Sequence, residues 1–192
     1  AGTAGLGLAE GFTSAQIEAM FNLNVFGPQR INRTVLPGMR ARGDGLLIHV
    51  TSGIGRMVMP GMAVYCASKF ALEALAEGYH YELAPLGIDV VIVQPGAYPT
   101  PLANNMMGPG DPTRAPGYGP MAQLGEQMGG AMAAMLSGPG AGDPQDVADA
   151  ILKLVATPVG QRPLRTVVDA HPEGVIAINT VCAQVQAGLL GA

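Results

Sequence analysis

A tyrosine and a lysine stand four residues apart, at Tyr65 and Lys69, in a segment whose apolar pattern predicts a helix. Residues four apart lie on one helix face, one turn from each other. An ammonium held near a phenol favours the phenolate, so we expect the pKa of Tyr65 to fall toward neutral pH. A phenol tuned in this way can give or take a proton. Such pairs also arise by chance on solvated helix faces, so the surrounding sequence decides what this one means.

Two further polar residues fall where chemistry is possible. Asn24 lies on the mostly apolar face of a predicted helix, where its amide must find hydrogen-bond partners. Ser52 follows a short apolar run that is typical of a buried parallel strand, and ligands of open α/β sheets bind at the carboxyl ends of strands. Neither residue requires a ligand: Asn24 could be a structural residue that hydrogen-bonds to nearby backbone, and Ser52 could serve only to stabilise a turn. His49, inside the same run, is interpreted as a packed core residue and not as a ligand.

Hydrophobic periodicity indicates the elements that position these residues. Thr13 begins a capping box at the start of the first helix, and Pro37 predicts a local bend in it. The predicted helices cover residues 13–42, 62–83, 143–155 and 172–190, and the predicted strands cover residues 46–50, 88–93 and 164–168. This alternation predicts an α/β fold with a parallel sheet. The second helix is apolar nearly all round, so we expect it to be buried, with a subunit contact as one explanation.

Residues 95–142 are rich in glycine and proline and are predicted to form a long loop within a single domain that spans residues 1–192. Residues 121–136 can form one or two helical turns there. The segment carries six methionines, which adapt to irregular apolar surfaces. A substrate-covering lid over an apolar molecule and a packed loop without a ligand are equally good interpretations.

The bulk composition excludes several classes of protein. The 192 residues are 48% hydrophobic and 12% charged, which indicates a compact chain and not a disordered one. A net charge of -4 gives no electrostatic reason to expect nucleic acid or an anionic membrane as partner. The two cysteines, Cys66 and Cys182, have neither a disulfide framework nor metal-ligand spacing, so we expect no metal and a cytoplasmic location. We also expect no membrane span, because we find no apolar run of about 18 residues.

Four features in register resemble the short-chain dehydrogenase/reductase family. Asn24 begins an Asn-Val-Phe-Gly segment that resembles the family's helix asparagine motif. Ser52 precedes Tyr65 by thirteen residues, which is the family's usual spacing. Tyr65–Lys69 resembles the family's Tyr-x-x-x-Lys helix, and Pro95–Thr100 resembles its Pro-Gly-x-x-x-Thr loop. The similarity is clear over residues 1–100 and looser beyond them.

The resemblance implies hydride exchange between NAD or NADP and a small alcohol or ketone, which the methionine-rich segment suggests is apolar. It implies that Tyr65 is the general acid/base and that Lys69 lowers its pKa and binds the cofactor ribose. Ser52 would hold the substrate oxygen and stabilise charge there. Asn24 would position a water in a proton relay. A sugar-nucleotide epimerase or dehydratase also uses this tyrosine and lysine, but the Asn24 segment and the Pro95–Thr100 loop favour a simple dehydrogenase.

The resemblance also implies which other residues contact ligands. The loop after the second strand would hold the nicotinamide carboxamide. The implied cofactor-binding residues are Gly2, Tyr65, Lys69, Pro95, Gly96, Tyr98 and Thr100. The implied substrate-contacting residues are Ser52, Gly53 and Tyr65. A homo-oligomer is implied as well.

The N-terminus departs from the family pattern. The chain begins at Ala1 without an initiator methionine, so it looks like the middle of a larger protein. Gly2, Gly5 and Gly7 follow no strand and are not a dinucleotide fingerprint. We therefore expect a Rossmann-like sheet that lacks the family's first four strands and has an exposed edge. The alternative to an oxidoreductase is a non-catalytic fragment that acts as a packing or dimerisation module through its first two long helices.

Overall fold

The computed structural model describes residues 2–102 and 105–191, and its centre is a parallel sheet of three strands. The strands are β1 (Gly45–Val50), β2 (Ile88–Pro95) and β3 (Arg165–Val168), in the order β1-β2-β3. Gly45 lies opposite Ile88, and Ile92 lies opposite Arg165. The predicted α/β fold with a parallel sheet is confirmed, and each strand lies within two residues of its predicted bounds.

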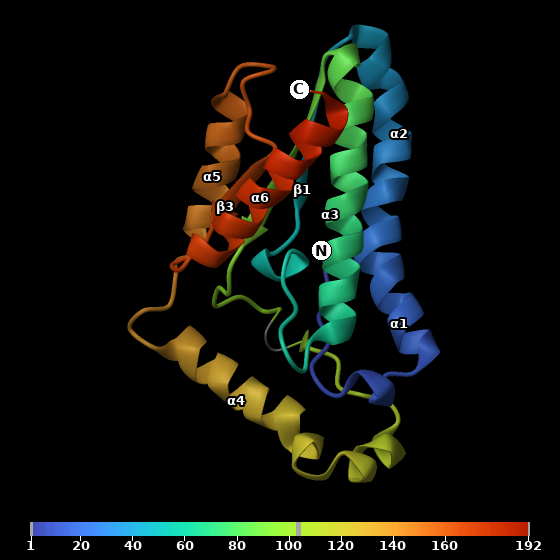
Figure 1. The fold of residues 1–192 in the computed structure, drawn as a ribbon, viewed down its shortest axis with the longest axis vertical. Helices are drawn as coiled ribbons and strands as arrows, with labels where there is room; N and C mark the ends of the chain where they lie inside the picture. The colour runs from blue at the N-terminus through green and yellow to red at the C-terminus, as the bar shows by residue number, and fades with distance from the viewer. Residues whose placement is uncertain (1, 103–104, 192) are drawn as a thin grey trace.

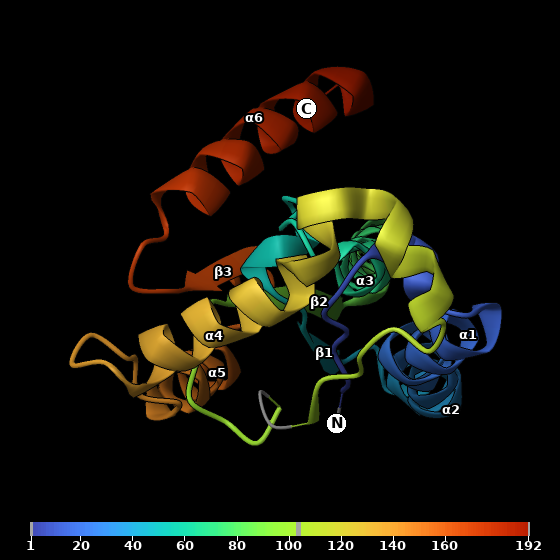
Figure 2. The ribbon, with the colours of Figure 1, turned by 90° about the horizontal axis from the view of Figure 1, so that it is seen from below.

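Helices cover both faces of the sheet (Figures 1 and 2). One face carries α2 (Gly27–Arg42) and α3 (Ala63–Leu83), and the other carries α5 (Gln145–Ala156). Helix α1 (Ser14–Phe21) packs against α3 beside the sheet. Successive side chains of a strand point to opposite faces. Val90 accordingly packs with residues of α2 and α3, while Val91 and Val93 pack with Leu154 of α5. Because β2 is covered on both faces, its side chains are apolar nearly throughout.

The first helical stretch begins with the predicted capping box. Thr13 Oγ1 accepts a hydrogen bond from the Gln16 amide at 3.3 Å, and Gln16 Oε1 accepts one from the Thr13 amide at 3.0 Å. The stretch then widens into a π-helical segment, η2 (Asn22–Phe26), which the sequence did not predict. It continues through Pro37 to the end of α2. The departure from α-helical hydrogen bonding therefore lies around Asn24.

The helix that carries Tyr65 is buried on one face only. The other face exposes Phe70 and Tyr81 to solvent. In the single chain the expected burial of this helix is therefore confined to the face that packs on the sheet, and a subunit contact over the other face stays a prediction.

Much of the predicted loop at 95–142 is helical. It contains a 3-10 segment, η6 (Pro112–Gln123), and the helix α4 (Leu124–Ser137), longer than the one or two turns predicted. Glycines let α4 approach the N-terminal segment closely. A Cβ on Gly125 would stand 3.1 Å from the Gly7 Cα, and one on Gly129 would stand 3.3 Å from Leu6. Packing against residues 2–11 thus outweighs the low helix propensity of glycine.

The last helix, α6 (Glu173–Leu190), stands out from the rest of the chain (Figure 2). Val175 near its start is buried, whereas Val181, Val185 and Leu189 are exposed. Among the described residues, α6 alone has the length and composition that a membrane span needs. Helix α6 is not an unbroken apolar run, because Asn179 and Thr180 interrupt it, and it reaches the threshold only as an average over 18 residues. The expectation of no membrane span stays a prediction.

The outer edge of β1 has no strand partner in the part of the chain that the structure describes. Val50 at its end is exposed. The predicted exposed edge is therefore present.

His49 is a buried core residue, as expected. Its side chain is 6% exposed, and Asn32 Nδ2 lies 3.3 Å from Nε2, which can accept that hydrogen bond only when the imidazole is neutral. Burial lowers the pKa of His49 from 6.5 to about 4. Between these pH values the unfolded chain binds a proton at His49 that the folded chain does not bind.

We therefore expect the free energy of unfolding to fall by about 3 kcal/mol through His49 as the pH drops from 6.5 to 4. Urea denaturation of His49→Gln at both pH values should show a smaller loss than the unsubstituted chain. His171→Gln, which replaces an exposed histidine, is the matched control and should keep the full loss. Identical acid sensitivity of His49→Gln and the unsubstituted chain would contradict the assignment.

Candidate active site

Ser52 and Tyr65 meet where β1 ends. Ser52 directly follows the residue after β1 and caps a short 3-10 turn, with Oγ accepting from the Ile54 amide at 3.4 Å. The Ser52 hydroxyl also lies near enough to the Tyr65 hydroxyl to lower the pKa of the phenol. The Ser52 Oγ donates to the Pro95 carbonyl at the end of β2, at 3.5 Å. The carboxyl ends of two neighbouring strands therefore hold the serine in front of the tyrosine.

Lys69 lies one helical turn after Tyr65 on the buried face of α3. Its Nζ is 5.7 Å from the centroid of the Tyr65 ring and donates to the Val50 carbonyl at 3.4 Å. Both side chains are largely enclosed, with Tyr65 7% and Lys69 9% exposed. The spacing read from the sequence thus brings the phenol and the ammonium to one place.

The expected fall of the Tyr65 pKa is wrong for the chain as described. Burial raises the pKa of Tyr65 to about 12, against a smaller lowering by the nearby Ser52 hydroxyl. Burial also lowers the pKa of Lys69 to about 8. The physical reason is that both charged forms lose water in the same apolar surroundings, and the ammonium is aimed at the Val50 carbonyl rather than at the phenol oxygen.

Asn24 is buried in the π-helical segment and uses its side chain to join two parts of the chain. Its Oδ1 accepts from the Thr3 amide at 3.1 Å, and its Nδ2 donates to the Thr3 carbonyl at 2.9 Å. Nδ2 also donates to Ser68 Oγ at 3.0 Å, and that hydroxyl donates to the Tyr65 carbonyl at 2.7 Å. The asparagine thus links the N-terminal segment to the helix of the tyrosine. A Cβ on Gly2 would stand 3.6 Å from the Asn24 Oδ1, so Gly2 also lies here, whereas Ala1 lies outside the described residues.

The loop after β2 is held against the end of β3. The Gly96 amide donates to the Val168 carbonyl at 2.8 Å, and the Tyr98 hydroxyl donates to the same carbonyl at 3.3 Å. A Cβ on Gly96 would meet the Asp169 carboxylate, so a larger residue here would require that side chain to move. Within the described ranges, no hydrogen bond joins Tyr98 or Thr100 to the Tyr65 side. The structure therefore brings Ser52, Tyr65, Lys69 and Pro95 together and leaves the rest of the loop beside them.

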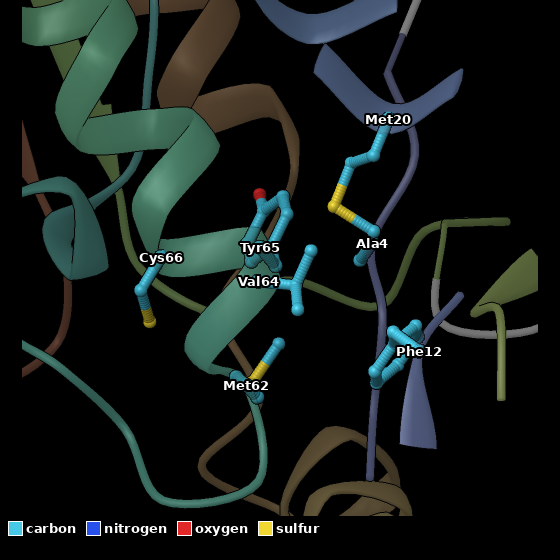
Figure 3. Packing of buried hydrophobic residues seen from close by; sticks show 7 residues of the cluster. All are labelled: Ala4, Phe12, Met20, Met62, Val64, Tyr65 and Cys66. Carbon is cyan, nitrogen blue, oxygen red and sulfur yellow. The ribbon is translucent and has the colours of Figure 1, made fainter. Parts of the chain in front are cut away.

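Apolar side chains surround Tyr65 on the side of the N-terminal segment. Figure 3 shows side chains from that segment, from α1 and from the start of α3 converging near the tyrosine. The buried members are Ala4, Phe12, Met20, Met62, Val64, Tyr65 and Cys66, and the partly buried methionines Met59, Met106, Met107 and Met132 pack against them. Flexible thioethers therefore form much of the surroundings of the phenol.

A family model described as short chain dehydrogenase matches residues 1–108, which is more than half of the chain. The chain belongs to the short chain dehydrogenase family. The match covers the asparagine, serine, tyrosine and lysine positions and the loop after β2.

Related proteins of the short chain dehydrogenase kind are longer than this chain. The uncharacterized oxidoreductase YusZ of Bacillus subtilis is 35% identical over 80% of this chain and 54% of its own length. A short-chain dehydrogenase from Streptomyces avermitilis is 33% identical, with a TM-score of 0.68 over 98% of this chain and 65% of its own. One from Sphingobium yanoikuyae, solved with NADPH, shares the fold at 24% identity, with a TM-score of 0.70 over 100% of this chain and 62% of its own. The chain thus spans about half to two thirds of the length of these relatives.

Sequence reasoning missed three polar residues around this site. Ser68 bridges Asn24 to the Tyr65 carbonyl, and Thr51 and Glu73 hydrogen-bond to each other behind Ser52. A signal was present: Ser68 and Glu73 stand three and eight residues after Tyr65, on the same side of a helix as the tyrosine. Polar residues at those positions in an apolar run need partners inside the protein.

Proposed function

We propose that this chain provides the acid–base and substrate-binding part of an oxidoreductase that interconverts an alcohol and a carbonyl with NAD or NADP. The observation that carries the proposal is the convergence of Ser52, Tyr65 and Lys69 at the carboxyl ends of β1 and β2. Ligands of open α/β sheets bind at this edge. Membership of the short chain dehydrogenase family supports the same reaction class.

The cofactor, when bound, supplies or takes the hydride at the substrate carbon, and the side chains of this chain act on the substrate oxygen. In the direction of reduction, the Ser52 hydroxyl donates a hydrogen bond to the carbonyl oxygen, and Tyr65 gives it a proton as the carbon gains the hydride. A pKa of about 12 keeps the phenol protonated at neutral pH, which is the form that can donate. Oxidation of the alcohol requires the phenolate, so it requires a lower Tyr65 pKa.

The residues present fit the nicotinamide riboside end of a dinucleotide. An ammonium has three donors, and the Lys69 Nζ uses one of them on a protein acceptor, the Val50 carbonyl. Ribose hydroxyls are acceptors for the others. Pro95, Gly96, Tyr98 and Thr100 would hold the carboxamide, as the family resemblance implies. Within the described residues no strand precedes Gly2, Gly5 and Gly7, so these glycines do not form a pyrophosphate-binding turn and the proposal is confined to this end.

We propose an apolar alcohol or ketone as the substrate. The support is the methionine-rich cluster around Tyr65, whose side chains adapt to irregular apolar shapes. In this proposal Gly53, beside Ser52, contacts the substrate, and α4 lies over the N-terminal segment as part of the cover. The division of the chain into one domain with a lid at 95–142 stays a prediction.

A homo-oligomer is part of the proposal. It rests on the family resemblance and on apolar side chains exposed on α2 and α3, among them Ile31, Phe70 and Tyr81. A cytoplasmic location stays a prediction.

Titration of this chain with NADH and with NADPH tests the proposal. The chain has no tryptophan, so the emission of the reduced nicotinamide can be followed without interference from indole. We expect saturable binding in the micromolar to millimolar range. Because the chain would contact only the nicotinamide riboside end, reduced nicotinamide mononucleotide should compete and 5′-AMP should not. Absence of binding at millimolar NADH and NADPH would contradict the proposal for this chain and favour the packing-module alternative.

A further inference from the structure

Glu73 is a buried carboxylate that the proposed chemistry does not use. It lies on α3, one turn after Lys69 and two turns after Tyr65, and is 1% exposed. A carboxylate loses several kcal/mol of hydration when it is buried, so its presence calls for specific partners. It has three, and together with Glu73 they form what we call the Glu73 cluster: Thr51, Gln94 and Arg165.

Both carboxylate oxygens of Glu73 are occupied. Oε1 accepts from Thr51 Oγ1 at 2.5 Å and from Gln94 Nε2 at 2.9 Å. Oε2 pairs with Arg165 Nε at 3.0 Å, and the Arg165 side chain is also largely buried. One residue of α3 thus contacts the residue that follows β1, a residue of β2 and a residue of β3.

Two members of the cluster directly precede residues of the proposed active site. Thr51 precedes Ser52, and its amide donates to the Val93 carbonyl at 2.9 Å while its hydroxyl donates to Glu73. Gln94 precedes Pro95, whose carbonyl accepts from Ser52. A displacement of Glu73 would therefore move Thr51 and Gln94, and with them the adjacent residues Ser52 and Pro95.

The Glu73 cluster also contacts the last helix, and its carboxylate affects the pKa of Lys69. Gln94 Oε1 accepts from Asn179 Nδ2 of α6 at 2.7 Å. The Glu73 charge favours the ammonium of Lys69 and so opposes the lowering of the Lys69 pKa by burial. The Tyr65 ring also lies beside the Lys69 ammonium. Behind Glu73, Arg165 forms an ion pair with a second carboxylate, Glu77. The charge of Arg56 also lowers the pKa of Glu77.

We propose that Glu73 is a positioning residue that holds the carboxyl ends of β1 and β2 against α3, and so sets the placement of Ser52 relative to Tyr65 and Lys69. This proposal rests on the proposed function. It explains why three polar side chains and an arginine are buried beside the site, where apolar residues would pack at a lower cost in hydration.

The first test compares Glu73→Gln with Glu77→Gln. Both substitutions remove one carboxylate partner of Arg165, but only Glu73 touches Thr51 and Gln94. We expect Glu73→Gln to lower kcat about tenfold with little change in KM, because misplaced catalytic groups slow the chemical step. Glu77→Gln should keep kcat within about twofold. Equal losses in the two variants, or an unchanged kcat in Glu73→Gln, would overturn the proposal.

A second readout does not depend on turnover. Lys69 and Lys153 are the lysines of this chain, so a sample labelled with carbon-13 at lysine Cε gives one buried and one exposed signal. Removing the Glu73 charge should lower the titration midpoint of the Lys69 signal, because that charge favours the ammonium, while the Lys153 signal stays in place. An unchanged midpoint overturns the proposal. If the unsubstituted chain binds no cofactor, the proposed function fails, and this titration still decides whether Glu73 acts on Lys69.

A second pair of variants covers the case in which Glu73→Gln does not fold. Thr51→Val keeps the shape of the side chain and removes the hydroxyl that donates to Glu73, whereas Thr51→Ser retains the hydroxyl. We expect a lowered kcat in the valine variant and recovery in the serine variant. Equal kcat in the two would overturn the proposal.

Discussion

Replacing Tyr65 by phenylalanine is expected to lower kcat by about 10²- to 10⁴-fold in an active form of the protein, which is the usual loss when a general acid is removed. The substitution removes only a hydroxyl. The ring keeps its place in the methionine-rich cluster, where it is 7% exposed, so the fold should survive. The measurement is the rate of reduction of a panel of apolar ketones with NADH and NADPH, beside a thermal unfolding curve.

Tyr118→Phe is the matched control for this substitution. Tyr118 is an exposed tyrosine whose hydroxyl donates to Glu10 at 2.9 Å, away from Tyr65, so the same chemical change should leave turnover intact. Turnover of Tyr65→Phe near that of the unsubstituted protein would refute the role of Tyr65 as proton donor.

Replacing Lys69 by methionine is expected to weaken cofactor binding about 10- to 100-fold, because a hydrogen bond to a charged group contributes about 1.5–3 kcal/mol. It should also shift the pH–rate profile toward higher pH, since loss of the ammonium disfavours the phenolate of Tyr65. Methionine is of similar length and needs no hydration, so stability at neutral pH should be unchanged or higher. NADH titration, a pH–rate series and urea denaturation measure the three effects.

The pH dependence of stability separates Lys69 from other groups. Its pKa is lowered from 10.5 to about 8, so between these values the unfolded chain holds a proton that the folded chain has released. The free energy of unfolding of the unsubstituted chain should therefore rise by about 3 kcal/mol relative to Lys69→Met across that window. Lys153→Met, which replaces the exposed lysine of α5, is the control and should keep the rise.

An unchanged pH–rate profile in Lys69→Met would refute the coupling of lysine and tyrosine.

The Tyr65 pKa illustrates where reasoning from the sequence stopped. The spacing of Tyr65 and Lys69 correctly placed both on one face of α3. It did not predict that the same face would be so enclosed that burial would raise one pKa and lower the other. Desolvation depends on atoms supplied by β1, the N-terminal segment and the loop, which are distant along the chain.

Asn24 and α4 show the same limit in backbone structure. The amide of Asn24 was expected to need partners, and its partners are Thr3 and Ser68, but the π-helical segment that carries it was not expected. The glycines of α4 argued against a helix of fourteen residues. They allow the close contact with Gly7 and Leu6 that stabilises it, and that contact has no local signature in the sequence.

What the sequence determined by itself is local. Apolar periodicity located the strands and the long helices to within a few residues, and the order of four short motifs identified the family, because both depend on residues near each other in the chain. The tertiary structure alone decided how water is excluded from Tyr65 and Lys69 and which groups meet Glu73. Arg165 reaches Glu73 from 92 residues away, and Gln94 from 21. Contacts of that kind form only when β1, β2 and β3 pack beside α3, so the spacing of residues in the sequence does not predict them.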